Sequence, residues 1–129
     1  MRGIPAPPAE RTERGRLAEG LAERYLRAQG YEILERNVRF RRGEIDIVAR
    51  DGDEIVFVEV RSRRAGACRS PEFLSQAKRR ALLRAAAVWV GRRGYGNSLC
   101  RFDLVTVRFA RDAARLEHLR SAFVDDLDE

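Results

Sequence analysis

The sequence predicts one α/β domain in which helices flank a mixed β-sheet, with the elements in the order α-β-β-β-α-β. Two segments, near 13–29 and 71–90, repeat apolar residues at helical spacing. Four other segments are rich in large apolar residues or alternate apolar with polar residues, which is typical of strands. The chain has 129 residues, a length that suits one domain with a single core. This mixture of elements favours one sheet with helices packed against it.

The first helix follows a segment that we expect to be flexible, because residues 1–11 are rich in proline and charge. The helix ends at Gly30, and its apolar stripe comprises Leu17, Leu21, Ala22, Tyr25, Leu26 and Ala28. We place the single domain at 12–124, and an acidic tail follows at 125–129. The predicted strands cover 31–40, 44–50, 55–63 and 101–109, with a short last strand over 116–123.

The second helix follows an irregular stretch over 64–69. Ser70 is expected as its N-cap and Pro71 as its first helical residue. The helix runs to about Val90, and its inward stripe is predicted to comprise Leu74, Ala77, Ala81, Ala85 and Val88. Glycines then mark a turn over 91–97.

The charge balance makes nucleic acid the first partner to consider. The 26 Lys and Arg residues outnumber the 20 Asp and Glu residues, which gives a net charge of +6, and Lys78 is the only lysine. Guanidinium groups suit phosphate contacts, and a basic surface attracts polyanions at low salt. A codon preference for arginine explains the same excess, so both explanations stay open.

Other features argue against several classes of protein. No stretch approaches the ~20 apolar residues that cross a bilayer, so we expect no membrane association. The first residues, Met1 to Pro8, lack the apolar run of a secretory signal, which favours a cytoplasmic protein. Cys68 and Cys100 are far apart and His118 is the only histidine, which argues against a zinc site and a disulfide framework.

A predicted β-hairpin places the residues that carry chemistry. Asp51-Gly52 is expected as its two-residue turn. In that register Asp46 and Glu59 are diagonal neighbours on one face, about 7–8 Å apart at the backbone, and Arg61 projects from the same face. The opposite face carries two apolar rows that we expect to pack against a helix, namely Ile45, Ile47 and Ala49, and Val56, Val58 and Val60.

The pair Asp46 and Glu59 predicts a site for a divalent metal ion. Converging carboxylates repel each other unless a cation lies between them or one is protonated. Mg²⁺, or Mn²⁺ in its place, accepts one or two carboxylates together with waters and phosphate oxygens. Such an ion polarises a phosphodiester and lowers the pKa of a bound water. The alternative is a solvated face on which these acids and Arg61 form a salt bridge worth ~0–1 kcal/mol.

Two segments of this hairpin resemble a known family. Gly43-Glu44-Ile45-Asp46 and Phe57-Val58-Glu59-Val60-Arg61-Ser62-Arg63 are similar to motifs of the YraN-like family of uncharacterised bacterial proteins. That family resembles archaeal Holliday-junction resolvases and restriction endonucleases of the PD-(D/E)xK type. Further matches, within about 13–125, are Gly15, Glu19, Ala22, Leu26, Gly30-Tyr31, Arg36-Asn37, Lys78-Arg79, Arg101-Phe102-Asp103 and Ala122-Phe123. The resemblance implies a restriction-endonuclease-like αβββαβ core.

The resemblance also implies roles for individual residues. Asp46 and Glu59 would be the metal-binding acids, and the carbonyl of Val60 would supply another ligand. Glu19 takes the place of a first-helix acid that completes such sites in the resolvases. The alternative for Glu19 is a charge on the helix surface.

One position departs from the motif, which normally has lysine where this chain has Arg61. Arginine stays charged and is a poor base, although it can stabilise charge that develops on a phosphate. Lys78 is the alternative source of a catalytic lysine, because it lies beside the predicted inward stripe of the second helix. It is otherwise a rim residue whose ammonium group stays in water.

Further polar residues are candidates for contact with a nucleic-acid backbone, although a solvated basic face explains them equally well. They are Arg63, Arg64, Gln76, Arg79 and Arg80, with Arg84 beside them. Trp89 and Phe102 are at core spacing and are expected to be packing residues. His118 is expected on a strand surface or at an interface.

The charge balance, the acidic pair and the resemblance together predict a nucleic-acid-binding protein, with the nuclease-like fold that the resemblance implies. We expect a Mg²⁺-dependent endonuclease that acts on DNA, on branched or recombination intermediates, while RNA stays open as a substrate. A homodimer would suit two-fold junction substrates. Two alternatives stay open: a non-catalytic nucleic-acid-binding module, which Arg61 favours, and a protein-interaction adaptor whose basic face meets an acidic partner.

Overall fold

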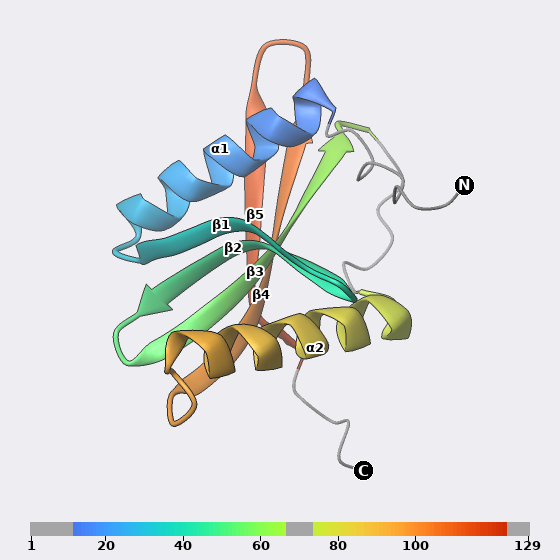
Figure 1. The fold of residues 1–129 in the computed structure, drawn as a ribbon. Helices are drawn as coiled ribbons and strands as arrows, with labels where there is room; N and C mark the ends of the chain where they lie inside the picture. The colour runs from blue at the N-terminus through green and yellow to red at the C-terminus, as the bar shows by residue number, and fades with distance from the viewer. Residues whose placement is uncertain (1–11, 67–73, 124–129) are drawn as a thin grey trace, which may run out of the picture.

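The computed structural model describes residues 12–66 and 74–123, and it confirms the predicted α/β class. A five-stranded sheet is flanked by two helices (Figure 1). The elements are α1 (Glu13–Ala28), β1 (Glu32–Phe40), β2 (Gly43–Asp51), β3 (Glu54–Arg64), α2 (Gln76–Arg93), β4 (Leu99–Phe109) and β5 (Ala114–Phe123). This arrangement is compatible with the αβββαβ core that the resemblance implies.

The sheet is mixed, with its strands in the order β1-β2-β3-β4-β5. Neighbouring strands run antiparallel except β3 and β4, which are parallel. Parallel neighbours need a long crossover, and the segment that contains α2 supplies it between these two strands. The last strand, β5, begins at Ala114 instead of the predicted Leu116 and is therefore longer than predicted.

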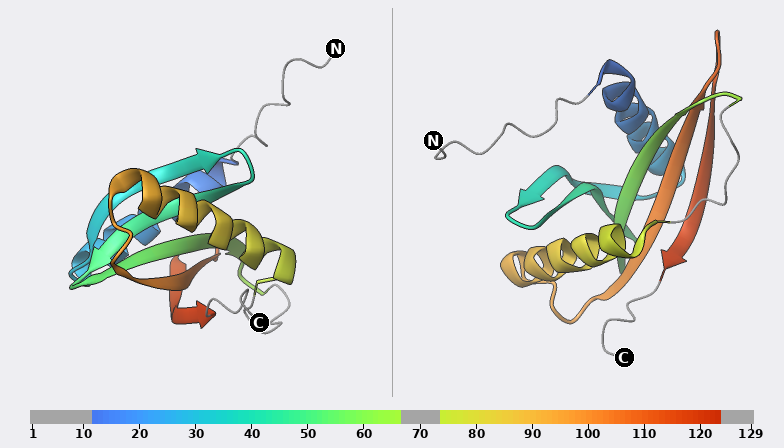
Figure 2. Two further views of the ribbon diagram at one scale, coloured as in Figure 1. Left: turned by 60° about the horizontal axis from the view of Figure 1, so that its bottom comes forward. Right: turned by 90° about the vertical axis from the view of Figure 1, so that its right-hand side faces the viewer.

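The two helices cover opposite faces of the sheet, as the right-hand view of Figure 2 shows. The α1 side buries Ala18, Ala22, Leu26, Ile47, Ala49, Val56, Val58, Val105 and Val107. The α2 side buries Val48, Ile55, Phe57, Leu82, Leu83, Ala85, Ala86, Trp89, Phe102 and Leu104. Both faces of β2 and β3 are covered. Consecutive residues at the centre of each strand are therefore apolar, instead of every second residue only. The predicted packing role of Trp89 and Phe102 is confirmed.

Helix α2 differs from its prediction at both ends. The predicted start at Ser70-Pro71 lies outside the described residues, while the helix as described begins at Gln76. The Ser75 hydroxyl accepts a hydrogen bond from the Lys78 backbone N–H at 3.1 Å, which caps the first turn. The helix continues past Val90 to Arg93, and Gly94 then adopts a left-handed φ of 79°.

The buried face of α2 also differs from the predicted stripe. Val88 is 37% exposed, whereas Leu82, Leu83 and Trp89 are buried. The larger side chains remove more apolar area from water than the alanine-rich stripe would. Trp89 is further fixed by a hydrogen bond from its indole Nε1 to Glu35 Oε1 at 2.9 Å. The helix is therefore rotated relative to the prediction, and Val88 faces solvent.

The β2–β3 turn consists of Gly52 and Asp53, not of Asp51 and Gly52, because Asp51 pairs with Glu54. Gly52 has a φ of 61°, which suits a tight hairpin turn. The register is thus shifted by two residues from the prediction. A shift by an even number does not by itself move any side chain to the other face.

One residue of the predicted apolar row lies on the wrong face. Ile45 packs with Val38 in the cluster on the α2 side, whereas Ile47 belongs to the α1 side. The alternation breaks between them, at Asp46. Asn37, which lies between the residues of β1 that pair with Ile47 and Ile45, has a left-handed φ of 55°. This local irregularity turns the outer part of the β1–β2 hairpin toward α2.

Gly43 brings the β1–β2 hairpin into close contact with α2. A Cβ atom at this position would lie 2.5 Å from the carbonyl oxygen of Ala81, closer than packed atoms approach. Gly43→Ala is therefore expected to destabilise the fold by about 1–3 kcal/mol, because helix and hairpin must move apart. Thermal and urea unfolding would measure the change.

The matched control is Gly20→Ala, at a helical site with nothing within 4 Å of the added methyl group. That substitution should stabilise α1 by up to about 1 kcal/mol, because alanine is the better helix former. If Gly43→Ala were as stable as the wild type or more stable, the close approach of α2 to the hairpin would be refuted.

Candidate active site

Asp46 lies where the ladder between β2 and β3 ends. The last pair of this ladder is Ile47 with Val58, and Asp46 and Glu59 are the next residues of the two strands. The Asp46 Oδ2 atom accepts a hydrogen bond from the Val60 backbone N–H at 2.8 Å. A side-chain carboxylate thus replaces the main-chain acceptor that a continued strand pair would supply. This bond holds the buried Asp46 carboxylate against β3.

Glu59 projects toward α2 and is 8% exposed. Its Oε2 atom lies 3.3 Å from the ammonium group of Lys78, a residue in the first turn of α2. Burial and the nearby negative charge of Asp46 raise the pKa of Glu59 to about 7, although Lys78 and Arg61 act in the opposite direction. The two acids are therefore close enough for their charges to interact.

Arg61 and Val60 complete this part of β3. The positive charge of the partly buried Arg61 lowers the pKa of Glu59, so the guanidinium group lies near the carboxylate pair. Val60 contributes its N–H group to Asp46, and the predicted role of its carbonyl as a metal ligand stays a prediction. Of the sequence-predicted catalytic residues, the structure brings Asp46, Glu59, Arg61 and Lys78 to one place.

Glu19 is buried on α1, which covers the opposite face of the sheet from α2. Its Oε1 atom lies 3.9 Å from Arg36 Nη2, and Arg36 also bonds Glu23 at 2.7 Å. Among the described residues there is no group of three or more His, Cys, Asp or Glu side chains that could hold a metal ion. Two carboxylates, Asp46 and Glu59, thus form the centre of the site, and the role of Glu19 stays a prediction.

The residues predicted to contact a nucleic-acid backbone lie at the end of β3 and the start of α2. Gln76, Arg80 and Arg64 are exposed. Arg63 donates to the carbonyl oxygen of Ser62 at 3.0 Å, and the Nε atom of Arg79 is buried without a hydrogen-bond partner in the described part of the chain. They lie on the same elements as Glu59 and Lys78, and their role also stays a prediction.

A buried polar network on β4 and β5 escaped sequence reasoning. His118 is not a surface residue, because its side chain is 6% exposed and its Nε2 atom lies 2.7 Å from Asp103 Oδ2. Arg101 Nε donates to the same carboxylate at 2.9 Å. Burial alone would raise the pKa of Asp103, but hydrogen bonds with His118, Arg101 and the Ser121 N–H lower it. Charged residues at Arg101 and Asp103, on one face of an apolar strand, were the signal for this pairing.

The cluster of Asp46, Glu59, Lys78 and Arg61 offers oxygen donors and cations side by side. Oxygen donors suit a hard divalent ion, and cations suit an anionic substrate. No helix in the described ranges is long and apolar enough to cross a membrane.

Glu59 makes the stability of the metal-free fold depend on pH. Because its pKa rises from the ordinary 4.5 to about 7 on folding, the folded chain binds the proton more tightly than the unfolded chain. Stability is therefore highest below pH 4.5 for this group and falls as pH rises to about 7. Glu59→Gln should abolish up to roughly 3 kcal/mol of this fall.

Urea unfolding in EDTA at pH 5 and pH 8 measures this difference. The control variant is Asp53→Asn, which removes an exposed carboxylate from the turn of the same hairpin. Wild type and Asp53→Asn should lose stability between the two pH values to the same extent, and Glu59→Gln should lose less. An unchanged pH slope in Glu59→Gln would show that the carboxylate is not held in a raised-pKa environment.

Comparison with known proteins assigns the sequence to a family. The model of the uncharacterised protein family UPF0102 matches residues 18–107, a range that contains Asp46, Glu59 and Lys78. A UPF0102 protein of Geobacter metallireducens is 42% identical over 110 residues, covering 84% of this chain and 90% of the relative. UPF0102 proteins of Anaeromyxobacter dehalogenans and Moorella thermoacetica are each 45% identical, covering 87% and 88% of this chain and 84% and 97% of the relatives. The chain therefore belongs to the uncharacterised protein family UPF0102, as its YraN-like motifs indicated.

Proposed function

We propose that this protein is a metal-dependent phosphodiester hydrolase that acts on nucleic acid, with DNA as its substrate. One observation carries the proposal. Asp46 and Glu59, from neighbouring strands, are buried next to each other and repel each other, so that the pKa of Glu59 rises to about 7. Folding tolerates such a pair at a cost, and a bound divalent cation removes that cost.

The residues present fit Mg²⁺ or Mn²⁺. Both donors are carboxylate oxygens, which hard cations prefer, and Mg²⁺ is commonly held by one or two carboxylates with waters and substrate phosphate oxygens. Asp46 and Glu59 would hold the ion, and the Val60 carbonyl and Glu19 are further candidates. When bound, such an ion polarises the phosphodiester and lowers the pKa of a water ligand.

Lys78 and Arg61 supply the positive charge that the reaction needs near the scissile phosphate. The Lys78 ammonium lies 3.3 Å from Glu59 and can donate hydrogen bonds to a water or a phosphate oxygen beside that carboxylate. The Arg61 guanidinium is positively charged and can stabilise charge on the phosphate in the transition state. Lys78 thus provides from α2 the lysine that the hairpin motif of this chain lacks.

The charge of the chain supports nucleic acid as the substrate class. The net charge is +6, and exposed cationic residues occupy the end of β3 and the first turns of α2, next to the acidic pair. Phosphate contacts of this kind position a backbone without reading its sequence. A phosphodiester would thus be held beside Asp46 and Glu59 by contacts on both elements.

A non-catalytic nucleic-acid-binding module is the second candidate. The observation that favours it is Arg61, because a guanidinium group cannot exchange a proton with the attacking water. In that case Asp46 and Glu59 would contribute to the binding of nucleic acid without cleavage, and Lys78 would compensate the negative charge of the pair. The two candidates differ in whether nucleic acid is cleaved.

Calorimetric titration with Mn²⁺ tests the metal site. Wild type and the turn variant Asp53→Asn should bind the ion equally, whereas Asp46→Asn should lose binding at least tenfold, because one of two charged donors is gone. Circular dichroism would establish that each variant is folded. Equal Mn²⁺ affinity in wild type and Asp46→Asn would reject the site.

Incubation with branched, single-stranded and duplex DNA tests the chemistry. Wild type should give products only with Mg²⁺ or Mn²⁺, and Glu59→Gln should lower the rate by at least a hundredfold. Lys78→Met should retain metal binding and lose most of the rate, since its ammonium group acts on the substrate side. Binding of all three substrates without cleavage would support the non-catalytic module instead.

A further inference from the structure

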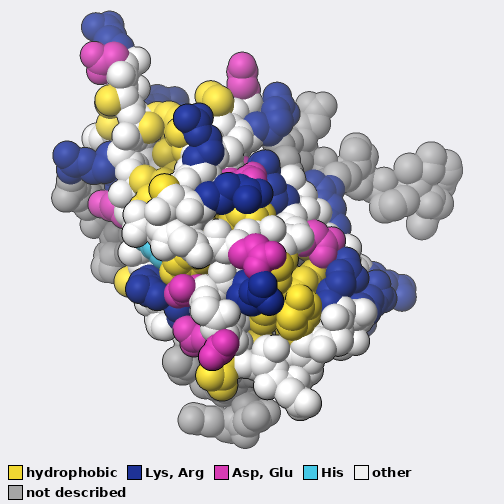
Figure 3. Space-filling view, turned by 90° about the vertical axis from the view of Figure 1, so that its left-hand side faces the viewer, with side chains coloured by type: hydrophobic (Ala, Val, Ile, Leu, Met, Phe, Trp, Pro, Cys, Tyr) yellow, Lys and Arg dark blue, Asp and Glu magenta, His cyan; other side chains and the backbone are white. Residues whose placement is uncertain are grey.

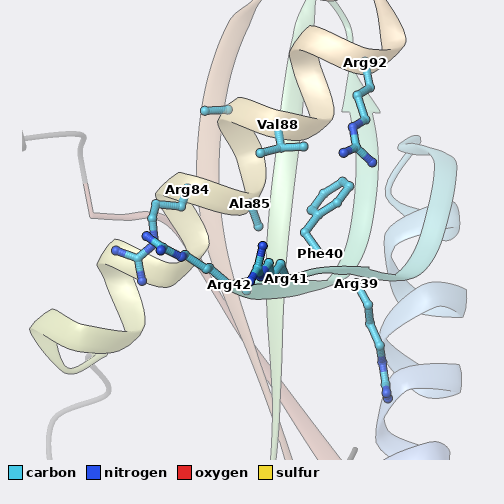
Figure 4. Close-up of a pocket in the computed structure, with 10 residues that line it drawn as sticks. Arg39, Phe40, Arg41, Arg42, Arg84, Ala85, Val88 and Arg92 are labelled. Atoms are coloured by element: carbon cyan, nitrogen blue, oxygen red, sulfur yellow. The ribbon is translucent and has the colours of Figure 1, made fainter. Parts of the chain in front are cut away.

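A groove between the β1–β2 turn and α2 lies outside the candidate active site. Its volume is about 630 Å³, within the range of ordinary ligand pockets. Five arginines line it: Arg39, Arg41, Arg42, Arg84 and Arg92. Figure 4 shows that Arg84, Ala85, Val88 and Arg92 come from α2, whereas Arg39, Phe40, Arg41 and Arg42 come from the end of β1 and the turn after it.

These arginines have no carboxylate partners among the described residues, in contrast to several others in the chain. Arg27, Arg93 and Arg101 each form an ion pair with Asp or Glu. On the face shown in Figure 3, Asp and Glu side chains are interspersed with Lys and Arg side chains. Figure 4 shows the Arg39 side chain pointing away from the groove toward α1, whereas Arg41, Arg42, Arg84 and Arg92 lie around it. Guanidinium groups gathered there without acidic partners in the described part of the chain repel each other, which favours an anionic ligand.

The floor of the groove is apolar. Phe40 lies beneath Arg92, whose guanidinium carbon is 5.2 Å from the ring centroid. Ala85, Ala87 and Val88 add an aliphatic wall, and Val88 is 37% exposed. A ligand that fills the groove must therefore combine a flat apolar group with negative charge. Nucleotides do so, because each base carries a π-face next to a phosphate.

We propose that this groove binds an unpaired segment of a nucleic-acid strand. The arginines contact phosphates, and a base lies against the Phe40 ring or the guanidinium plane of Arg92. The inference deepens the proposed function and rests on it, since it names the form of the substrate. A duplex is the poorer ligand, because its bases are stacked on each other and leave the apolar floor without a partner.

The position of the groove agrees with such a strand. Lys78 and Arg84 lie on the same helix, six residues apart, which is about 9 Å along the axis. The contact of Gly43 with Ala81 lies between them and fixes the hairpin against the helix. A strand held in the groove and running along α2 would therefore reach Glu59, which contacts Lys78.

The first test measures binding of labelled oligo-dT, an abasic strand of equal length, and a blunt duplex, all in EDTA. Wild type should bind oligo-dT at least tenfold more tightly than the abasic strand or the duplex. Arg84→Gln/Arg92→Gln should weaken oligo-dT binding at least tenfold and reduce the slope of log affinity against log salt by about 1.4. The control Arg24→Gln/Arg111→Gln removes the same charge from exposed positions on α1 and the β4–β5 turn and should change affinity less than twofold.

The second test separates base contact from charge. Phe40→Leu keeps the floor apolar but removes the ring, so oligo-dT affinity should fall toward that of the abasic strand, roughly tenfold. Equal effects of the two arginine pairs, or equal affinity for abasic and normal strands, would overturn the inference. An acidic peptide that displaces oligo-dT and binds more tightly would assign the groove to a protein partner instead.

Glu59→Gln distinguishes this inference from the proposed function. It should abolish cleavage without weakening oligo-dT binding in EDTA, because the groove does not include Glu59 and the substitution removes only a negative charge near the strand. Normal oligo-dT binding by the groove variants, together with metal-dependent cleavage by wild type, would refute the groove alone. Absence of binding to every nucleic acid would refute both proposals.

Discussion

The burial of two acidic side chains side by side is the constraint on which the rest of the site depends. The Asp46 carboxylate accepts a hydrogen bond from the Val60 N–H at the point where the β2–β3 ladder ends. This bond places the negative charge of Asp46 next to Glu59. Two buried charges of one sign need compensation, which Lys78 provides from another element. Helix α2 must therefore dock with its first turn over β3, and Gly43 permits the close approach that holds it there.

Periodicity was enough to predict the fold class and the faces of the hairpin, because the pattern of a strand has period two. The turn was placed one residue too early, which shifted the register by two, yet Asp46 and Glu59 kept a common site. The same logic failed at Ile45, where the left-handed φ of Asn37 interrupts alternation. Asparagine adopts a left-handed φ more readily than most residues, but the extended pattern around Asn37 did not by itself predict the irregularity.

Tertiary docking decided what the sequence could not. Glu59 and Lys78 are 19 residues apart in the sequence. Their side chains form an ion pair only because of the rotation of α2 about its axis. The helix packs with Leu82, Leu83 and Trp89 buried. In this orientation Val88 is exposed, and Arg84 and Arg92 lie around the groove. Intrinsic spacing could not choose between the two stripes, because alanines on both sides fit a helix equally well.

The electrostatics of the acidic pair explain how a site with two carboxylates can accept a polyanion. With a pKa of about 7, Glu59 is divided between its neutral and charged forms at neutral pH. The positive charges of Lys78 and Arg61 lie beside it. The site therefore repels a phosphodiester less than two full negative charges would. A bound divalent cation would favour the charged form of Glu59 and still leave the surroundings attractive to phosphate. The raised pKa of Glu59 is thus compatible with entry of a nucleic-acid strand before or after metal binding, whereas a permanently ionised pair would favour metal first.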